Sequence, residues 1–290
     1  MDKPTIFVNP KSGSIKINGE VELVDVDGKV IDTLTNPKLC GCGLSKDKPW
    51  CDSSHGEYVK IVAQQLRNAR ELVKPCNLFG TTTVRAREIR ENELNFRLEA
   101  GEELVGVKYG ATFGYLTNAM ECSGNLDVSK YMFPYAEAEV VFKLKKEIKS
   151  PIELDEVLNY VSHVSAGMEI YDSRFGNAAA SFNDSVADNA SATAFAHGQW
   201  LPATLDILEG LEAHVFINND VAEKAPLTSI RENPWMSVVA LSAELASMGL
   251  CLPADSIIFS GSATQEILML AGNTYKVEIK GLGSVVITAS

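Results

Sequence analysis

Residues 133–144 read FPYAEAEVVFKL, and this stretch predicts a strand that carries two acids. Side chains alternate between the two faces of a strand, so Glu137 and Glu139, two positions apart, leave the same face. The apolar residues on either side of them indicate that the strand is buried. An E-x-E pair by itself is also typical of a solvated strand face, so the pair alone leaves both interpretations open.

A third acid favours the buried interpretation. Glu169 interrupts the apolar run GMEIYDSR at residues 167–174. Unpaired buried carboxylates cost free energy, and carboxylate oxygens are the ligands that Mg²⁺ and Mn²⁺ prefer. Three acids within otherwise buried strands therefore predict a site for a hard divalent cation.

The rest of this region predicts a mixed arrangement of strands and helices. Strands are expected at 104–108, 136–144 and 168–172, with further strands in the last forty residues. A helix is expected at about 153–162, opened by a capping box that starts at Ser150. Another runs from Asn233 and Pro234 to Gly249. These strands and helices indicate the α+β fold class.

The amino end contains a second cluster of potential ligands, in the stretch LCGCGLSKDKPWCDSSH at residues 39–55. The spacing C-x-C-x₈-C-x₃-H lets Cys40, Cys42, Cys51 and His55 converge within one loop. Spacing alone fits zinc and an iron-sulfur cluster equally well.

The residues around the cluster predict a small separate domain. Asn18-Gly19 and Asp27-Gly28 lie between Val- and Ile-rich runs and predict a three-stranded meander. From residue 57 the apolar spacing becomes helical and predicts a linking helix at 57–75. Its apolar stripe is Tyr58, Ile61, Val62, Leu66, Ala69, Leu72 and Val73. The expected domains are residues 1–56 and 57–290, and so small a first domain needs a metal or cluster for stability.

The bulk composition narrows the class of protein. The chain has 290 residues, 46% of them hydrophobic, and a net charge of −12. We expect a folded cytoplasmic protein with no nucleic acid and no membrane as routine partners, because the charge is strongly acidic and no long apolar run occurs. Since three of the six cysteines stand alone, the clustered ones indicate metal binding rather than disulfides.

The intervening residues of the cysteine cluster resemble a known family. The run C-x-C-x₂-S-x₃-P-x-C-D-x-S-H is similar to the CDGSH iron-sulfur family over residues 12–56. The resemblance implies a [2Fe-2S] cluster, with Cys40 and Cys42 on one iron and Cys51 and His55 on the other. One departure is Ser53, which stands where that family has a glycine that serves a special backbone conformation.

The larger region resembles a second family, through seven blocks in order over residues 104–288. They are VGVKYGAT, PYAEAEVVF, GMEIYDSR, DSVADNASA, NPWMSVVALSAELASMG, IIFSGSAT and KGLGSVV. These blocks resemble the 2-keto-4-pentenoate hydratase and 4-oxalocrotonate decarboxylase branch of the fumarylacetoacetate hydrolase superfamily. The resemblance implies a mixed β-rich fold with flanking helices and a homo-oligomer. It also implies a Mg²⁺ or Mn²⁺ ion on Glu137, Glu139 and Glu169, with a 2-oxo acid chelated by that ion.

The same resemblance assigns further residues. It implies that Lys108 lies near the reacting enol as a catalytic residue, with Ser191 beside the substrate. It also implies substrate binding by Thr264, and by Asp188 and Asn189 through the order of their loop. Each assignment has an alternative interpretation. Lys108 could be an ordinary surface lysine, and Asp188, Asn189 and Ser191 are residue types that commonly cap turns. The family's acidic loop between the lysine and the E-x-E pair is missing here, since only twenty-eight residues separate Lys108 from Glu137.

These patterns support three functional hypotheses. The first is a metal-dependent lyase that hydrates a short unsaturated 2-oxo acid, as a 2-hydroxypenta-2,4-dienoate hydratase does, with an appended [2Fe-2S] module. The second is a lyase that resembles 4-oxalocrotonate decarboxylase. The third is a non-catalytic iron-sulfur carrier of electrons or clusters. The expected partners are a small 2-oxo acid and a redox or cluster-transfer partner.

Overall fold

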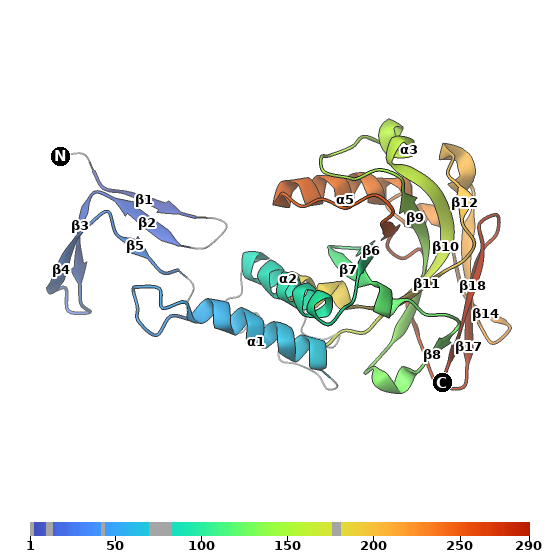
Figure 1. Ribbon diagram of the computed structural model, residues 1–290, viewed down its shortest axis with the longest axis horizontal. Helices are drawn as coiled ribbons and strands as arrows, with labels where there is room; N and C mark the ends of the chain where they lie inside the picture. The colour runs from blue at the N-terminus through green and yellow to red at the C-terminus, as the bar shows by residue number, and fades with distance from the viewer. Residues whose placement is uncertain (1–2, 10–13, 42–43, 70–82, 176–180) are drawn as a thin grey trace.

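The structure is a computed structural model that describes residues 3–9, 14–41, 44–69, 83–175 and 181–290. It confirms the α+β class, with strands predominating and a few helices around them. Figure 1 shows the N-terminal strands at one end, the helices α1 and α2 next to them, and two larger sheets at the other end. None of the helices in the described ranges is long and apolar enough to cross a membrane.

The largest sheet has β9 and β10 near its centre. Its order is β11-β10-β9-β15-β6-β7, and the short strands β12 and β16 pair with β10 and β9. The strands are β6 (Leu104–Tyr109), β7 (Phe113–Thr117), β9 (Tyr135–Leu144), β10 (Val161–Tyr171), β11 (Ala192–His197), β12 (Leu201–Pro202), β15 (Ile257–Phe259) and β16 (Ile267–Leu268). The predicted strands at 104–108 and 136–144 are therefore confirmed.

A second sheet packs against β10 and closes one side of the core. Its order is β14-β13-β17-β18-β8. The strands are β8 (Asn125–Leu126), β13 (Glu212–Ile217), β14 (Asp220–Pro226), β17 (Thr274–Ile279) and β18 (Gly283–Ala289). Alternate residues of β17 and β18 are buried, as expected for strands with one solvated face. Both β17 and β18 contact β10, so one core lies between the sheets.

The helix α5 (Trp235–Met248) packs on the core beside the largest sheet, where Trp235 contacts Phe142. Its predicted end is confirmed, because Gly249 takes the left-handed conformation with φ 68°. At its start, Asn233 Oδ1 accepts a hydrogen bond from the backbone N–H of Trp235 at 3.1 Å. This side chain holds the first turn as predicted, and Pro234 lies directly before the helix.

The helix predicted at 153–162 is wrong in length and cap. A 3₁₀ turn at Leu154–Glu156 leads into the short helix α3 (Val157–Tyr160), and β10 begins at Val161. The capping box is formed by Glu153 and Glu156, not by Ser150. Val161 and Val164 are buried in β10, whose pleated surface suits β-branched side chains. The strand predicted at 168–172 is the last part of this longer strand.

The predicted N-terminal meander is wrong, although one of its two hairpins is present. The strands β1 (Thr5–Val8), β2 (Ile15–Asn18) and β5 (Lys38–Leu39) form one sheet, and β3 (Glu20–Val24) pairs only with β4 (Val30–Thr35). Asp27-Gly28 forms the hairpin turn between β3 and β4. Asn18-Gly19 does not, because Gly19 bonds instead to Asn36, whose Oδ1 accepts from the Gly19 N–H at 2.8 Å.

The linking helix α1 (Ser54–Asn68) begins inside the cysteine motif, three residues before the predicted start at 57. It packs against α2 (Thr83–Glu99) and shares a buried cluster with α4 (Phe182–Ala187). The predicted stripe is wrong at Ile61, which is 50% exposed. The predicted residues Leu72 and Val73 lie outside the described ranges. The buried residues of α1 are Val59, Val62, Ala63 and Leu66.

Candidate metal centre and substrate cavity

The strands β9 and β10 bring the three predicted acids together. Their antiparallel register places Glu169 directly opposite Glu137, and Glu139 lies two residues further along β9. One carboxylate oxygen from each of the three residues lies within 4.8 Å of the others. Glu139 and Glu169 are fully buried. Three acids from two strands therefore converge on one point inside the protein.

Lys108 faces this group of acids from the end of β6. Its Nζ lies 2.9 Å from Oε1 and 3.1 Å from Oε2 of Glu169. Burial by itself lowers the pKa of a lysine, but the neighbouring carboxylates outweigh it and the pKa of Lys108 is raised. Lys108 therefore remains a charged ammonium beside the acids.

The electrostatics of this group fit a divalent cation. Burial, and next the charge of Glu169, raise the pKa of Glu137 to about 7, and the pKa of Glu139 is raised well above its usual range. Oε2 of Glu139 accepts a hydrogen bond from the Gly261 N–H at 2.9 Å, whereas Oε1 is buried with no hydrogen-bond partner among the described residues. Three carboxylates face one ammonium, and a doubly charged ion would balance the excess.

A cavity of about 290 Å³ opens onto this group. Besides the acids and Lys108, its described lining contains Gly110, Ala111, Thr112, Tyr171, Ser185, Ala190, Ser191, Gly261 and Ser262. Sequence reasoning did not identify Tyr171, although the strand period places it on the same face as Glu169. Thr112 and Ser185 lie in the family blocks VGVKYGAT and DSVADNASA, but neither was assigned a role, because a turn and a short helix carry no strand period that places them beside the acids.

The loop at 188–191 has a strained backbone next to the cavity. Asn189, Ala190 and Ser191 are consecutive residues with φ of 54°, 52° and 59°. A left-handed conformation costs about 1–2 kcal/mol for each such residue. Strain of this kind persists only where the surrounding contacts determine the backbone, and it is often associated with function.

Two buried side chains hold this loop. Asp188 forms an ion pair with Arg174, which also donates to the Asp188 carbonyl at 2.8 Å. The side chain of Asn189 bonds both the N–H and the carbonyl of Tyr115, at 2.7 and 2.9 Å. Burial raises the pKa of Asp188, and the Arg174 guanidinium opposes that shift. Together these contacts connect the loop to β7 and to the segment after β10.

The structure brings some of the predicted substrate-side residues to the cavity and not others. Ser191 lines it, and its hydroxyl donates to Asp188 Oδ2 at 2.8 Å. Asp188, Asn189 and Thr264 are not among the described lining residues. Asp188 and Asn189 instead hold the loop, as their ordering role predicts. Thr264 Oγ1 is buried without a hydrogen-bond partner among the described residues.

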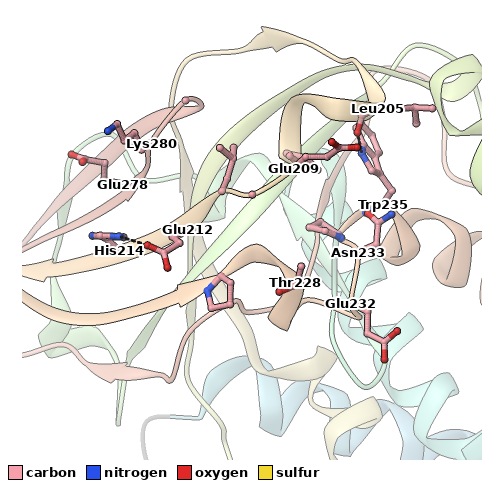
Figure 2. A pocket seen from close by; sticks show the side chains of 16 residues that line it. Leu205, Glu209, Glu212, His214, Thr228, Glu232, Asn233, Trp235, Glu278 and Lys280 are labelled. Carbon is pink, nitrogen blue, oxygen red and sulfur yellow. Dashed lines mark hydrogen bonds and ion pairs between the residues drawn. The ribbon is translucent and has the colours of Figure 1, made fainter.

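A larger cavity of about 1010 Å³ lies elsewhere, beside β13 and the start of α5 (Figure 2). Figure 2 shows Glu209, Glu212 and Glu232 around it, with His214 next to Glu212. These three glutamates are exposed, so water solvates their charges and no cation is needed. The smaller cavity, where buried acids converge, is therefore the candidate site.

The cysteine motif forms a second candidate site. Ligand atoms of Cys40, Cys51 and His55 lie within 4.8 Å of one another, and the predicted ligand Cys42 lies outside the described residues. Asp52 holds the loop, because its carboxylate accepts from the backbone N–H groups of Lys46 at 2.8 Å and Ser54 at 2.9 Å. These hydrogen bonds lower the pKa of Asp52. Two thiols and an imidazole at this separation fit an iron-sulfur or zinc site.

Ser53 has the backbone conformation that its position predicts. Its φ is 67°, in the left-handed region that glycine adopts at no steric cost. Because serine has a Cβ, the backbone of Ser53 is strained in this conformation, and this strain lies between the ligands Cys51 and His55.

Two family models match the chain. One, described as iron-binding zinc finger CDGSH type, matches residues 12–56. The other, described as fumarylacetoacetate (FAA) hydrolase C-terminal, matches residues 125–289. The first match covers the cysteine motif, and the second covers the three converging acids but not Lys108.

Curated relatives and a solved structure extend the second match. A 4-oxalocrotonate decarboxylase from Pseudomonas sp. is 30% identical over 78% of this chain and 96% of its own length. A 2-hydroxyhexa-2,4-dienoate hydratase from Comamonas testosteroni is 30% identical over 76% of this chain and 92% of its own length. The structure of 4-oxalocrotonate decarboxylase from Pseudomonas putida G7, complexed with magnesium and adipate, matches with a TM-score of 0.76 and 26% identity. That alignment covers 81% of this chain and 98% of the other.

Proposed function

The chain belongs to the fumarylacetoacetate hydrolase family, and on that premise we propose that it is a metal-dependent lyase for a short unsaturated 2-oxo acid. The preferred reaction is hydration of a substrate of the 2-hydroxypenta-2,4-dienoate type. One observation carries the proposal: three carboxylates from β9 and β10 converge with Lys108 on a cavity of about 290 Å³. The relatives named as hydratases support the reaction type.

Glu137, Glu139 and Glu169 would hold a Mg²⁺ or Mn²⁺ ion in this enzyme. When bound, the ion supplies a Lewis acid that polarises the 2-oxo group, which typically contributes several kcal/mol to the stability of the transition state. The solved relative with magnesium supports this choice of metal. Burial of Glu139 and Glu169 excludes water from the ligand set and strengthens its hold on a cation.

Lys108 would move a proton at the enol end of the substrate. Its ammonium is buried and lies within 3 Å of Glu169, so it faces the place where the ligand carboxylates meet. A charged donor in that position stabilises an enolate oxygen and can protonate the adjacent carbon. Ser191, whose hydroxyl is held by Asp188, would contact the substrate from the wall of the cavity.

Decarboxylation is the second candidate reaction, because relatives named 4-oxalocrotonate decarboxylase match the chain well in sequence and in fold. Both reactions need the same polarised 2-oxo group and differ in what happens at the far end of the substrate. The third hypothesis, a carrier without catalysis, requires the cavity to bind a 2-oxo acid without turnover.

The N-terminal region would carry a [2Fe-2S] cluster on Cys40, Cys42, Cys51 and His55. The match to the CDGSH model and the grouping of the three described ligands support it. An imidazole ligand raises the reduction potential relative to four thiolates, which suits exchange of electrons or clusters with a partner protein. We also propose that the enzyme forms a homo-oligomer.

Purified protein decides among these functions. With Mg²⁺, hydration of 2-hydroxypenta-2,4-dienoate should remove its ultraviolet absorbance, and 4-oxalocrotonate tests decarboxylation through CO₂ release. Loss of turnover in Glu169→Gln, with the fold intact by circular dichroism, is the expected result. Inertness of the wild-type protein towards both substrates would leave the carrier hypothesis. Visible absorbance and iron content test the cluster, and zinc in its place would refute it.

A further inference from the structure

The turn between β6 and β7 joins the cavity to a fourth carboxylate. Residues 110–112 of this turn line the cavity, and Thr112 is only 3% exposed. The Thr112 hydroxyl donates a hydrogen bond to Oε1 of Glu244 at 3.3 Å. Glu244 lies on α5, 132 residues further along the chain. A buried hydroxyl in the cavity wall therefore connects the substrate space to an acid outside the metal group.

The other acids near the cavity are occupied. Glu137, Glu139 and Glu169 form the candidate metal centre, and Asp188 is paired with Arg174. Asp127, which lies between Lys108 and Glu137 in the sequence, is exposed and caps the 3₁₀ turn that follows it. Glu266 lies near Glu137 and Tyr171 but is exposed. Among the described residues, Glu244 is thus the carboxylate outside the metal group and the Asp188–Arg174 pair that is hydrogen-bonded to a side chain of the lining.

Two further side chains, Tyr109 and Arg231, lie around Glu244 and the turn. The phenol of Tyr109 lies near Glu244, and burial and then the Glu244 charge raise the pKa of Tyr109 to about 12. Arg231 stacks on the Tyr109 ring at 4.6 Å and donates to the Gly110 carbonyl at 2.7 Å, which fixes the turn. Glu244 itself is only partly buried, so it can exchange protons with water.

We propose that Thr112 is a catalytic residue of the hydration reaction and that Glu244 is the positioning residue that orients its hydroxyl and receives its proton. This inference rests on the proposed function. The 2-hydroxy-2,4-dienoate first loses its enol proton to solvent and gains a proton at C5, which gives the 2-oxo-3-enoate. A water molecule then adds its oxygen to C4 and gives a proton to Thr112 Oγ1. The hydroxyl proton of Thr112 passes at the same time to the Glu244 carboxylate. Lys108 gives a proton to C3, so charge and atoms balance, and solvent later restores both groups.

The relay explains how the chain can work without the acidic loop of its family. That loop would supply a carboxylate between Lys108 and Glu137, and this chain is too short there to carry it. Here the carboxylate comes from helix α5 and acts through a hydroxyl of the turn that follows Lys108.

Three variants test the relay. Glu244→Gln keeps the side-chain shape and the hydrogen bond from Thr112 but cannot take a proton, so kcat for hydration should fall about 10²-fold or more with little change in KM. Thr112→Val removes the hydroxyl at nearly constant volume, and its kcat for hydration should fall by the same factor. Thr112→Ser restores a hydroxyl and should regain most of the activity. A purely structural role would not produce this rescue pattern.

A second readout separates the relay from the proposed function. Exchange of the C3 protons of 2-oxopentanoate in D₂O, followed by NMR, requires the metal centre and Lys108 but no addition of water. Glu244→Gln and Thr112→Val should retain this exchange while losing hydration. Wild-type hydration together with an equally active Glu244→Gln would overturn the relay alone. Wild-type protein that neither hydrates nor exchanges would overturn the proposed function and the relay with it.

Discussion

Gly114 in β7 controls the position of the strained loop at 188–191. A Cβ added at Gly114 would lie 2.1 Å from the carbonyl oxygen of Asn189 and 2.9 Å from its carbonyl carbon. Ordinary contact begins at 3.4 Å, so in Gly114→Ala the Asn189 backbone has to retreat by about 1 Å. The loop also carries Ala190 and Ser191, which line the cavity.

The expected cost of Gly114→Ala has two parts. Forcing a methyl group into a packed site typically destabilises a protein by about 1–3 kcal/mol. A displacement of about 1 Å in a substrate-positioning group can lower activity by about 10²-fold. We therefore expect kcat/KM for hydration to fall by about two orders of magnitude, with a lower unfolding temperature. Ultraviolet assays and thermal unfolding measure the two effects.

Two control variants make the Gly114→Ala result interpretable. Ile287→Val removes one buried methyl group in β18, far from the loop in sequence, and should cost about 0.5–1.5 kcal/mol with full activity. Gly110 lines the same cavity, but a Cβ added there has no neighbour within 4 Å. Gly110→Ala should therefore change stability little. Gly114→Ala with wild-type kcat/KM and wild-type stability would refute the argument, because the loop would then tolerate the displacement.

Three other substitutions test separate features. Ser53→Gly should slow loss of the visible cluster absorbance in acid or chelator, because relief of about 1–2 kcal/mol of left-handed strain exceeds the entropy cost of about 0.4–1 kcal/mol for glycine; faster loss would contradict this. Arg174→Met should cost about 3–5 kcal/mol in urea unfolding by leaving Asp188 buried and unpaired, and a second change, Asp188→Asn, should recover part of that loss. Glu139→Gln should weaken Mn²⁺ binding, measured by calorimetry, by more than the roughly 10–100-fold typical of losing a residue that only supports a metal ligand. Unchanged Mn²⁺ affinity would exclude Glu139 as a ligand.

The candidate metal group was accessible from the sequence because it depends on local patterns. Alternation along β9 places Glu137 and Glu139 on one face, and an apolar run marks Glu169 as buried. The register in which β9 and β10 pair does not follow from these local patterns. A shift of one residue would turn Glu169 to the other face, and only the long antiparallel ladder of β9 with β10 fixes the register.

Contacts between distant segments account for what the sequence did not reveal. Asn18-Gly19 and Asp27-Gly28 carry similar turn signals, yet Gly19 is drawn to Asn36 and the chain leaves its sheet there. Likewise, nothing near Thr112 indicates that Glu244 will reach it from α5. Local propensity ranks the possible turns and helices, whereas tertiary partners select among them.

The helix α1 connects the two candidate sites more closely than the sequence motifs suggest. His55 lies in its first turn, and the predicted domain boundary at residue 56 falls within the same helix. Further along, Val59, Val62 and Leu66 pack against α2 and α4, and each such buried side chain contributes about 1.5–3 kcal/mol. The helix is thus anchored to the larger domain by its middle, not by the cluster ligands. Because α2 packs on both α1 and α4, and α4 carries Ser185 of the cavity lining, these three helices form a packed connection between the cysteine motif and the cavity.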